Sequence, residues 1–471
     1  MKNEEFRKYA HQMVDWIADY FEDIEKYPVK SGVSPGEIAG NLPIQPPLKG
    51  ERMDAIFEGF KENIMPGITH WQHPGWFAYF PANSSPPSVL GEFLTAGLGV
   101  QGMVWDTSPA ATELEEVVMN WLRQMTGLPD NFTGVLQDTA STATLCALIS
   151  AREKVSHFKT NQIGFHQKLR IYTSNQTHSS IEKGVKIAGF GKENLVYIDT
   201  DDHFALIPQK LEEAILRDLE NGYTPCCVVA ACGTTSSLAM DPLMETGQIC
   251  EKYNLWFHID AAFAGTAAIA PEFRYVLEGA ELSDSLVFNP HKWMLTNFDC
   301  SAYFVKDPEI LKQSFSLMPE YLKTAADEKV NNYRDWGIQL GRRFRALKLW
   351  FVISYYGVEG IQQIIREHVR LGQLFASWVE KDKNFEFTAP PNLTLVCFRL
   401  IKNGLPEKAI NSMNEELLRI INQQGDIYLT HTKLNGRYTL RMSIAQRNTK
   451  QHHVEKAWEI ITKAGNSLIK Q

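Results

Sequence analysis

The sequence predicts an α/β fold, in which a mostly parallel central sheet is followed by a smaller α+β domain. Short apolar runs rich in β-branched residues recur between residues 169 and 306, and helical stretches separate several of them. These runs are almost continuously apolar, which is typical of strands buried on both faces of a parallel sheet. The 471 residues also suffice for several domains of roughly 150 residues each.

The first 85 residues are expected to form a helical arm. Apolar residues recur at helical spacing over residues 4–26, which predicts an amphipathic helix that Pro28 ends. Residues 28–50 hold several Pro and Gly, which favours an extended segment. A helix with one apolar face and no core of its own packs on another subunit or on its own chain. The sequence favours the first arrangement.

Residues 86–360 are expected to form the large α/β domain. Thr112 and Glu115 are spaced like a capping box at the start of a helix over 112–128. The other expected helices cover 141–155, 208–222, 242–254 and 342–357. The expected strands are 169–174, 194–199, 226–232, 255–260, 285–290 and 301–306. Residues 307–340 are charged and lack a clean period, which suggests a mobile loop.

Residues 361–471 are expected to form the smaller α+β domain. Residues 436–445 have the pattern of a strand pair, and residues 452–468 have that of a helix.

Composition excludes several classes of function. A net charge of −8 disfavours binding to nucleic acid or to anionic membranes. The seven cysteines are scattered without zinc-ligand spacing, as expected of reduced, buried thiols. The N-terminus lacks the apolar core of a signal peptide, and no apolar run approaches the length of a membrane span. The expected location is therefore the cytoplasm.

Two neighbouring strand ends carry residues suited to chemistry. Asp260 ends one apolar strand, and Lys292 follows the next. Ligands bind at the carboxyl ends of strands in an open parallel sheet. A buried acid and a lysine on one rim are costly unless they are paired or reactive.

Pyridoxal phosphate (PLP) accounts for both residues. It needs a lysine for covalent attachment, an acid beside its ring nitrogen, and an anion site for its phosphate. Thr139, Ala140 and Ser141 open a predicted helix, whose N-terminus can bind that phosphate. Each motif alone is commonly structural, but their order along the chain favours a PLP site.

The chain resembles group II PLP-dependent decarboxylases of the aromatic-L-amino-acid decarboxylase family. The resemblance runs nearly end to end, and FNPHKW, HIDAAFAG and THSSIEKG are its most specific motifs. It extends to IMPGITHWQHPGWFAYFPANSS, SPAATELE, TASTATLCALISAR, GTTSS, YRDWGIQLGRRFRALKLWF and LRMSIAQRNT. It implies the PLP-dependent transferase fold type I, similar to that of aspartate aminotransferase.

The resemblance also implies roles for single residues. Lys292 would attach the cofactor and Asp260 would pair with its ring nitrogen. His178 and Ala262 would pack on opposite faces of the ring. The remaining expected cofactor contacts are Ala140, Ser141, Thr235, Asn289 and His291. His178, His258 and His291 have no metal-ligand spacing, so no metal is expected.

The implied reaction is loss of CO2 from an aromatic L-amino acid, followed by protonation of its Cα. In the family a loop tyrosine supplies that proton, and Tyr333 occupies its position. Relatives with Phe there resemble aldehyde synthases, so Tyr333 and His178 together favour amine formation. Tyrosine is a weak acid in water, so a loop that closes over the site belongs to the expected mechanism.

The resemblance places the substrate in an aromatic pocket. Its expected residues are Trp71, Tyr79, Phe80, Pro81 and Ala82, with Gln101 and Met103 from a partner subunit, and Tyr355. Animal relatives have Ile and Phe in place of Gln101 and Met103, and Ala82 replaces a frequent Thr. Tyr355 is bulky at a position where plant relatives use a small residue. Tryptophan, 5-hydroxytryptophan, DOPA, tyrosine and phenylalanine all remain candidate substrates.

The expected assembly is a homodimer with active sites at the subunit interface. Other activities remain open: an aromatic aldehyde synthase, a decarboxylase of histidine or of a non-aromatic amino acid, and an aminotransferase. A non-catalytic binding protein is also open, although it would be expected to lack Lys292 or Asp260.

Overall fold

The computed structural model describes residues 1–317 and 329–470. Its large domain contains a seven-stranded sheet with the strand order β1-β7-β6-β5-β4-β2-β3. The strands are β1 (Thr133–Gln137), β2 (Leu169–Ser174), β3 (Leu195–Ile198), β4 (Thr224–Ala231), β5 (Trp256–Asp260), β6 (Ser285–Phe288) and β7 (Ser301–Val305). The neighbouring strands β6, β5, β4, β2 and β3 run parallel to one another, whereas β7 runs antiparallel to β6 and β1. The predicted α/β class is confirmed.

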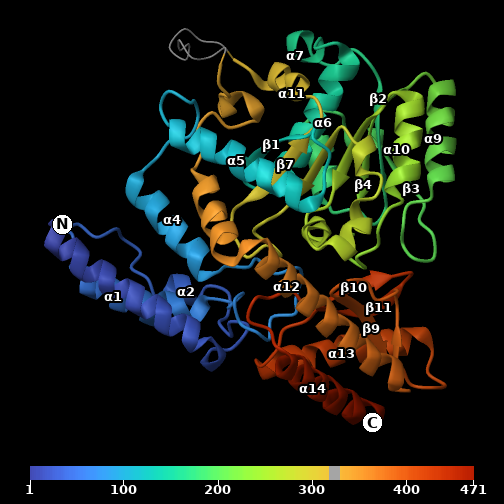
Figure 1. Ribbon diagram of the computed structural model, residues 1–471. Helices are drawn as coiled ribbons and strands as arrows, with labels where there is room; N and C mark the ends of the chain where they lie inside the picture. Colours follow the sequence, from blue (N-terminus) through green and yellow to red (C-terminus); the bar gives the residue numbers. More distant parts are fainter. Residues whose placement is uncertain (318–328, 471) are drawn as a thin grey trace.

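Both faces of this sheet are covered by helices (Figure 1). In β4, Cys227 and Val229 share a core cluster with residues of α6 (Ala140–Ser156) and α8 (Ser180–Ile187). The alternate residues Val228 and Ala230 belong to a cluster that includes α9 (Pro208–Glu220) and α10 (Leu243–Tyr253). Alternation along a strand sends side chains to opposite faces, so burial on both faces explains the continuous apolar run.

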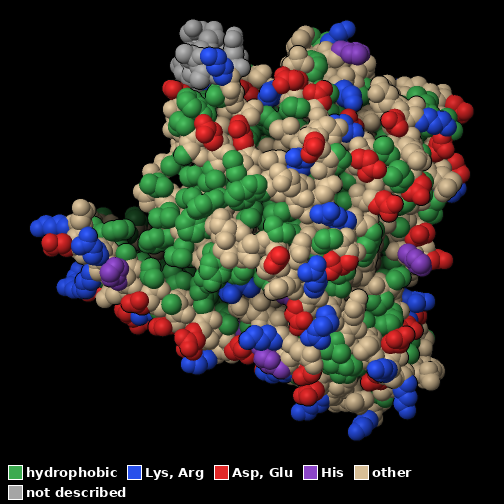
Figure 2. Space-filling model, in the orientation of Figure 1, with side chains coloured by type: hydrophobic (Ala, Val, Ile, Leu, Met, Phe, Trp, Pro, Cys, Tyr) green, Lys and Arg blue, Asp and Glu red, His purple; other side chains and the backbone are tan. Residues whose placement is uncertain are grey.

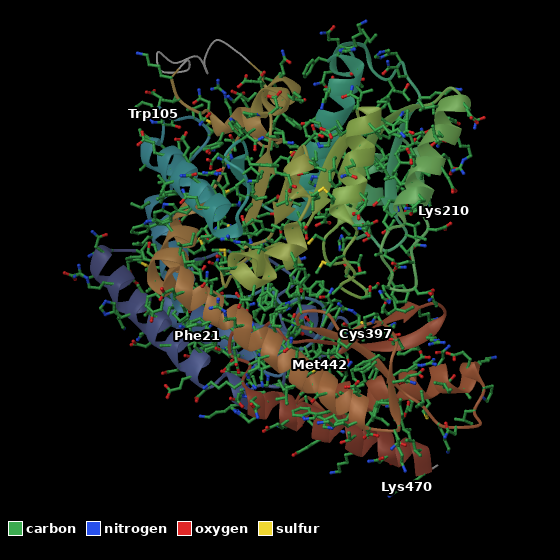
Figure 3. The ribbon with its side chains drawn as sticks, turned by 45° about the vertical axis from the view of Figure 1, so that its right-hand side comes forward. Phe21, Trp105, Lys210, Cys397, Met442 and Lys470 are labelled. Carbon is green, nitrogen blue, oxygen red and sulfur yellow. The ribbon has the colours of Figure 1, made fainter. Side chains whose placement is uncertain are left out.

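The smaller domain contains an antiparallel sheet with the order β10-β11-β9-β8. Its strands are β8 (Phe385–Phe387), β9 (Leu395–Leu400), β10 (Thr430–Leu434) and β11 (Arg437–Ser443), and α13 (Glu407–Gln424) and α14 (Gln451–Lys470) pack on it. Helix α12 (Arg345–Lys381) runs from the large domain across the expected boundary at residue 360, and Gly357 (φ 64°, ψ 171°) interrupts its helical backbone. Cys397 and Met442 lie in this small sheet (Figure 3).

Three local predictions were wrong. Helix α5 (Pro109–Thr126) begins after Ser108, so Thr112 and Glu115 lie inside the helix and form no capping box. The segment 436–445 contains one strand, β11, whose hairpin partner is the preceding β10. The expected loop at 307–340 contains α11 (Pro308–Phe315) and the 3-10 helix η9 (Tyr333–Trp336), while residues 318–328 lie outside the described part.

The N-terminal arm contains α1 (Asn3–Glu22), α2 (Glu37–Gly40) and α3 (Met53–Gly59). Trp16 of α1 packs edge-on against Phe57 and Phe60, with ring centroids 5.9 and 5.5 Å away. Figure 1 shows α1 at the periphery of the molecule, and Phe6 and Val14 are exposed. Part of the apolar face of α1 is therefore uncovered in the single chain.

Cysteine burial agrees with the prediction, because all seven thiols are buried and none forms a disulfide. Burial raises the pKa of each of these thiols, which keeps them protonated. Within the described residues, no helix has the length and apolar character to cross a membrane.

Candidate active site

A cavity of about 210 Å³ lies beyond the carboxyl ends of β4, β5 and β6. All nine residues that the sequence singled out for the cofactor line it: Ala140, Ser141, His178, Thr235, Asp260, Ala262, Asn289, His291 and Lys292. A larger cavity of about 660 Å³ lies between residues 201–209 and Pro390–Asn392, and none of these nine lines it. Cavity volume alone would therefore select a different site, and the candidate site is identified by the chemistry of the residues that line it.

Asp260 and Lys292 face the cavity from neighbouring strand ends. Asp260 is the last residue of β5, and its Oδ1 accepts the backbone N–H of Ala262 at 3.1 Å. Asn83 connects the backbone of Lys292 to the segment after β11, because its Nδ2 donates to the carbonyls of Lys292 (2.7 Å) and Ala445 (2.8 Å). Burial lowers the pKa of Lys292, and the charge of Asp260 opposes that shift. A larger fraction of the amine is therefore uncharged and nucleophilic.

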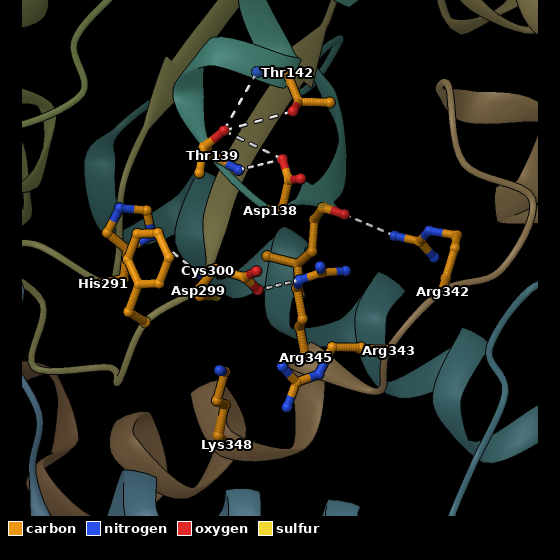
Figure 4. A network of polar contacts seen from close by, with 12 residues as sticks. Asp138, Thr139, Thr142, His291, Asp299, Cys300, Arg342, Arg343, Arg345 and Lys348 are labelled. Atoms are coloured by element: carbon orange, nitrogen blue, oxygen red, sulfur yellow. Dashed lines mark hydrogen bonds and ion pairs between the residues drawn. The ribbon is translucent and has the colours of Figure 1, made fainter. Parts of the chain in front are cut away.

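The opposite wall of the cavity is the start of α6. Thr139 is its N-cap residue, and its Oγ1 accepts the backbone N–H of Thr142 (Figure 4). Ala140 and Ser141 form the first turn, where backbone N–H groups have no partner within the helix. Such a helix start, with its partial positive charge, favours an anion such as a phosphate.

His291 and Asn289 add polar groups beside Lys292. Nδ1 of His291 accepts the backbone N–H of Cys300 at 3.0 Å. Burial, aided by the charge of Lys292, lowers the pKa of His291 to about 3, so the ring is neutral. Its single proton therefore lies on Nε2, which can donate to a ligand. Oδ1 of Asn289 accepts the hydroxyl proton of Ser301 at 2.5 Å, which fixes the orientation of its amide.

His178 lines the cavity from the loop after β2. Its Nδ1 accepts the backbone N–H of Ser180 at 3.1 Å and lies 2.8 Å from the Ser180 hydroxyl. Desolvation by the surrounding protein lowers the pKa of His178. The charge of Asp260 opposes this shift, and that of Lys292 adds to it. A neutral ring with its proton on Nε2 follows.

Of the expected substrate residues, Phe80 lines the same cavity. Its ring stacks on Phe263, with centroids 4.0 Å apart, and lies 5.7 Å from Nζ of Lys292. Trp71 stacks on Trp76 at 4.2 Å and on Tyr79 at 6.0 Å, while the carbonyl of Ala82 accepts Nε2 of Gln72 at 2.7 Å. Trp71, Tyr79, Pro81 and Ala82 do not line the cavity, although all four lie on the segment that carries Phe80.

Four expected residues lie away from the cavity of their own chain: Gln101, Met103, Tyr333 and Tyr355. Tyr333 is buried against Trp336, its ring centroid is 4.8 Å from the Arg342 guanidinium, and it lines a separate cavity of about 300 Å³. The backbone N–H of Arg342 donates to Oε1 of Gln101 at 2.7 Å, and that of Arg334 donates to the Met103 carbonyl at 3.0 Å. Tyr355 is 72% exposed.

Sequence reasoning missed several residues around the cavity. Thr234 and Phe263 line it, and Asn83 braces it. Thr234 precedes Thr235 in GTTSS and Phe263 lies in HIDAAFAG, so both motifs contained the signal. Arg441 lies behind Phe80 and donates to the Thr235 carbonyl. Thr235 is 206 residues away from Arg441 in sequence, so no local pattern indicates this contact.

One group outside the cavity has metal-ligand spacing within the described residues: Glu25, His452 and His453. His453 is buried, whereas Glu25 and His452 are exposed. Its Nδ1 accepts the backbone N–H of Lys450 at 2.9 Å, so its proton lies on Nε2, 3.3 Å from Oε1 of Glu25. That arrangement leaves His453 no free lone pair for a metal.

The observed residues fit PLP. The cavity joins a lysine whose pKa is lowered, an aspartate, the N-terminus of a 17-residue helix, and two further polar groups at one rim. These are the groups that a phosphorylated, electron-withdrawing aldehyde requires of its protein.

Comparison with known proteins agrees with this chemistry. Residues 35–401 match the pyridoxal-dependent decarboxylase conserved domain. The chain is 45% identical to phenylacetaldehyde synthase of Arabidopsis thaliana, covering 100% of this chain and 97% of that one. It is 44% identical to tyrosine decarboxylase 3 of Petroselinum crispum, covering 100% and 93%. The structure of Oryza sativa TDC with PLP and tryptamine superposes with a TM-score of 0.97, at 35% identity over 100% of this chain and 99% of that one.

Proposed function

Because the chain belongs to the pyridoxal-dependent decarboxylase family, we propose that it removes CO2 from an aromatic L-amino acid and forms the corresponding amine. One observation carries the proposal: Lys292, Asp260 and the start of α6 line a single cavity with the neutral ring of His178. These groups meet the needs of a PLP-dependent carboxy-lyase.

We propose distinct roles for these side chains. Lys292 attaches the cofactor through its uncharged amine, and Asp260 holds a proton on the cofactor ring nitrogen. Ala140 and Ser141 bind the phosphate through backbone N–H groups, with His291 donating from Nε2. When bound, PLP supplies an electron sink for the bond that breaks at Cα. The protein determines which bond breaks by orienting the amino acid.

The amine product requires a proton at Cα, and we propose Tyr333 as its source. Burial, with Glu115 and Glu116 adding to the effect, raises the pKa of Tyr333, so its hydroxyl stays protonated. The side chain is only 2% exposed and does not line the cofactor cavity, so we propose that η9 moves before the hydroxyl reaches such a cavity. The role of Tyr333 as proton donor is proposed from the motif that surrounds it. Because Tyr333 does not line the cavity of its own chain, we propose that it acts in the cavity of a partner subunit.

We propose a homodimer in which Tyr333, Gln101 and Met103 serve the cavity of the partner. Helix α4 (Pro86–Leu98) supports this assembly, because four of its apolar side chains are exposed: Leu90, Phe93, Leu94 and Leu98. Figure 2 shows hydrophobic side chains gathered between the arm and the body, where α4 and the start of α12 lie. An apolar surface of this kind is typical of a subunit interface.

We propose an aromatic substrate because Phe80 borders Lys292 and continues into a stack of rings with Phe263. The alternative product is an aldehyde, released with oxidation and loss of ammonia. It has specific support, since the relative from Arabidopsis thaliana is named phenylacetaldehyde synthase. Tyr333 favours the amine.

One assay separates these products. PLP-loaded protein is given L-Trp, 5-hydroxy-Trp, DOPA, Tyr, Phe, His and Glu in turn, and CO2, amine, aldehyde and peroxide are quantified together. Equal CO2 and amine from aromatic substrates support the proposal, and aldehyde with peroxide supports the alternative. Activity on His or Glu alone would contradict the aromatic pocket.

The matched variant is Lys292→Ala. It is expected to abolish turnover and the absorbance band of the attached cofactor, because Lys292 is the only lysine among the described residues that line the cavity. Full activity in this variant would overturn the site assignment.

We also propose a cytoplasmic location. Seven buried, unpaired thiols favour a reducing compartment. Fractionation of cells that express the chain tests this, and recovery in a secreted fraction would contradict it.

A further inference from the structure

Arg441 is a buried cation in β11, where it pairs with Thr430 of β10 and Cys397 of β9. It is 3% exposed, and burial lowers its pKa with no carboxylate among the opposing groups. The neighbouring strand offers a contrast. Arg399 of β9 is 4% exposed but lies beside the carboxylates of Glu386 and Glu407. A buried guanidinium without a carboxylate needs other acceptors for its N–H groups.

The acceptors of Arg441 belong in part to the cofactor cavity. Nη2 donates to the carbonyl of Thr235 at 2.6 Å, and Nε donates to that of Ser236 at 3.0 Å. Thr235 lines the cavity, and Ser236 also accepts the Cys397 thiol at 3.4 Å. The rigid, planar guanidinium therefore fixes two successive carbonyls of a loop in the large domain from a strand of the small domain.

The other side of Arg441 faces the aromatic wall. Its guanidinium carbon lies 5.4 Å from the centroid of the Phe80 ring, within range of a cation–π interaction. Nη1 donates to Oγ1 of Thr430 at 3.0 Å, and that oxygen also accepts the backbone N–H of Tyr79 at 3.2 Å. Tyr79 has a φ of 52°, an uncommon conformation for a residue with a side chain, so its neighbours hold it there.

We propose that Arg441 is a positioning residue that sets the distance between the Thr235 wall and the Phe80 wall of the cofactor cavity. It does so from outside, since it does not line the cavity. Both walls are attached to the same guanidinium, so loss of Arg441 frees the loop and the aromatic segment to move separately. The inference rests on the proposed assignment of this cavity to the cofactor.

The test measures cofactor release and the circular dichroism of the bound cofactor in the full-length protein. Arg441→Met is expected to release PLP roughly tenfold faster, the effect of losing one charge-assisted hydrogen bond. It is also expected to change the dichroic band, which reports the asymmetry of the cavity. Arg441→Lys keeps the charge but cannot span two carbonyls, so an intermediate release rate is expected. This variant also serves if Arg441→Met does not fold.

Arg399→Met is the matched control, because it removes an equally buried arginine from the adjacent strand. It is expected to lower the unfolding midpoint while leaving the release rate and the dichroic band unchanged. Release from Arg441→Met at the wild-type rate, or at the same raised rate as from Arg399→Met, would overturn the inference. If the wild-type protein gave no Lys292-dependent absorbance band with PLP, the assignment of the cavity would fail instead.

Discussion

The rings of Phe80 and Phe263 lie nearly parallel, at 12°, with their centroids 4.0 Å apart. Phe263 stacks in turn on Trp293 at 4.8 Å and 3°. Trp293 directly follows Lys292, and Phe263 directly follows Ala262. One stack of rings therefore joins the segment expected to bind substrate to the two loops expected to bind the cofactor. The positions of all three segments thus depend on the same aromatic contacts.

Phe80→Leu keeps an apolar side chain but removes the first ring of that stack. We expect the free energy of unfolding to fall by about 1 kcal/mol, the usual worth of an aromatic pair. We also expect faster release of PLP and a raised KM for aromatic substrates, because Phe80 borders the cavity. Phe398→Leu is the control: its ring packs on Phe375 at 5.3 Å in the small-domain core. Equal PLP release from both variants would contradict the link.

Local patterns predicted β2 to β7 of the large sheet, but not β8 or the fully buried β9 of the small domain. Strands β2 to β7 lie within two residues of their expected ends. Most of them are continuous apolar runs, because helices cover both faces of the sheet. β1 was missed, since TGVLQ has only two adjacent apolar residues. β10 was missed because THTKL is largely polar and two of its five residues are exposed.

The candidate site divides in the same way. The nine residues expected to bind the cofactor lie in short motifs at strand ends, and the topology of a parallel sheet brings such ends together. Contacts between residues distant in sequence determine the positions of Arg441 and Gln101. The proposed role of Tyr333 depends in addition on a second chain. No local spacing encodes contacts of that kind.

Glu115 and Arg342 form a buried ion pair that joins α5 to the segment after η9. Nη2 of Arg342 lies 2.6 Å from Oε1 of Glu115, and both side chains are at least nine-tenths buried. Oε1 of Glu115 also accepts the backbone N–H of Leu136 at 2.8 Å. We expect Glu115→Gln to lower the free energy of unfolding by about 3–5 kcal/mol, because it leaves a buried charge unpaired. Chemical denaturation measures this change.

The control for that prediction is an exposed pair. Arg366 and Glu272 contact each other at 2.5 Å, but both side chains are 44% exposed. Because solvent screens such pairs, they contribute little to the free energy of unfolding. Glu272→Gln is therefore expected to keep the wild-type denaturation midpoint. A Glu115→Gln midpoint equal to that of Glu272→Gln would show that the buried pair does not stabilise the fold.

Acid is expected to destabilise the protein through its buried histidines. Burial lowers the pKa of His73, His258 and His368 to about 4 and that of His291 to about 3. An unfolded histidine titrates near 6.5, so below that pH the unfolded chain binds protons that the folded chain does not. Stability is therefore lost as the pH falls from about 6.5 toward 4, by about 1.4 kcal/mol per pH unit for each such group.

A single substitution isolates one group. His258 lies between the hydroxyls of Thr144 (3.1 Å) and Ser285 (2.8 Å), both of which a glutamine can still contact. His258→Gln is expected to flatten the pH dependence of the unfolding free energy by the share of one histidine, whatever its effect on the absolute value. His166→Gln should keep the wild-type slope, because folding leaves that side chain exposed. If the unfolding free energies of the two variants had the same pH dependence, the proposed contribution of His258 to acid destabilisation would be refuted.

The division of the active site between subunits can be tested by mixing two chains, neither of which is expected to form amine alone. Lys292→Ala lacks the attachment point, and Tyr333→Phe lacks the proposed acid. If Tyr333 serves the partner, each mixed dimer contains one cavity with Lys292 from one chain and Tyr333 from the other, and amine production returns. If Tyr333 serves its own chain, no cavity in the mixture has both groups and amine production stays absent. The readout is amine alone, since Tyr333→Phe is expected to release aldehyde. The Tyr333→Phe protein diluted with an equal amount of a Lys292→Ala/Tyr333→Phe double variant provides the baseline, because no mixed dimer there restores a complete cavity.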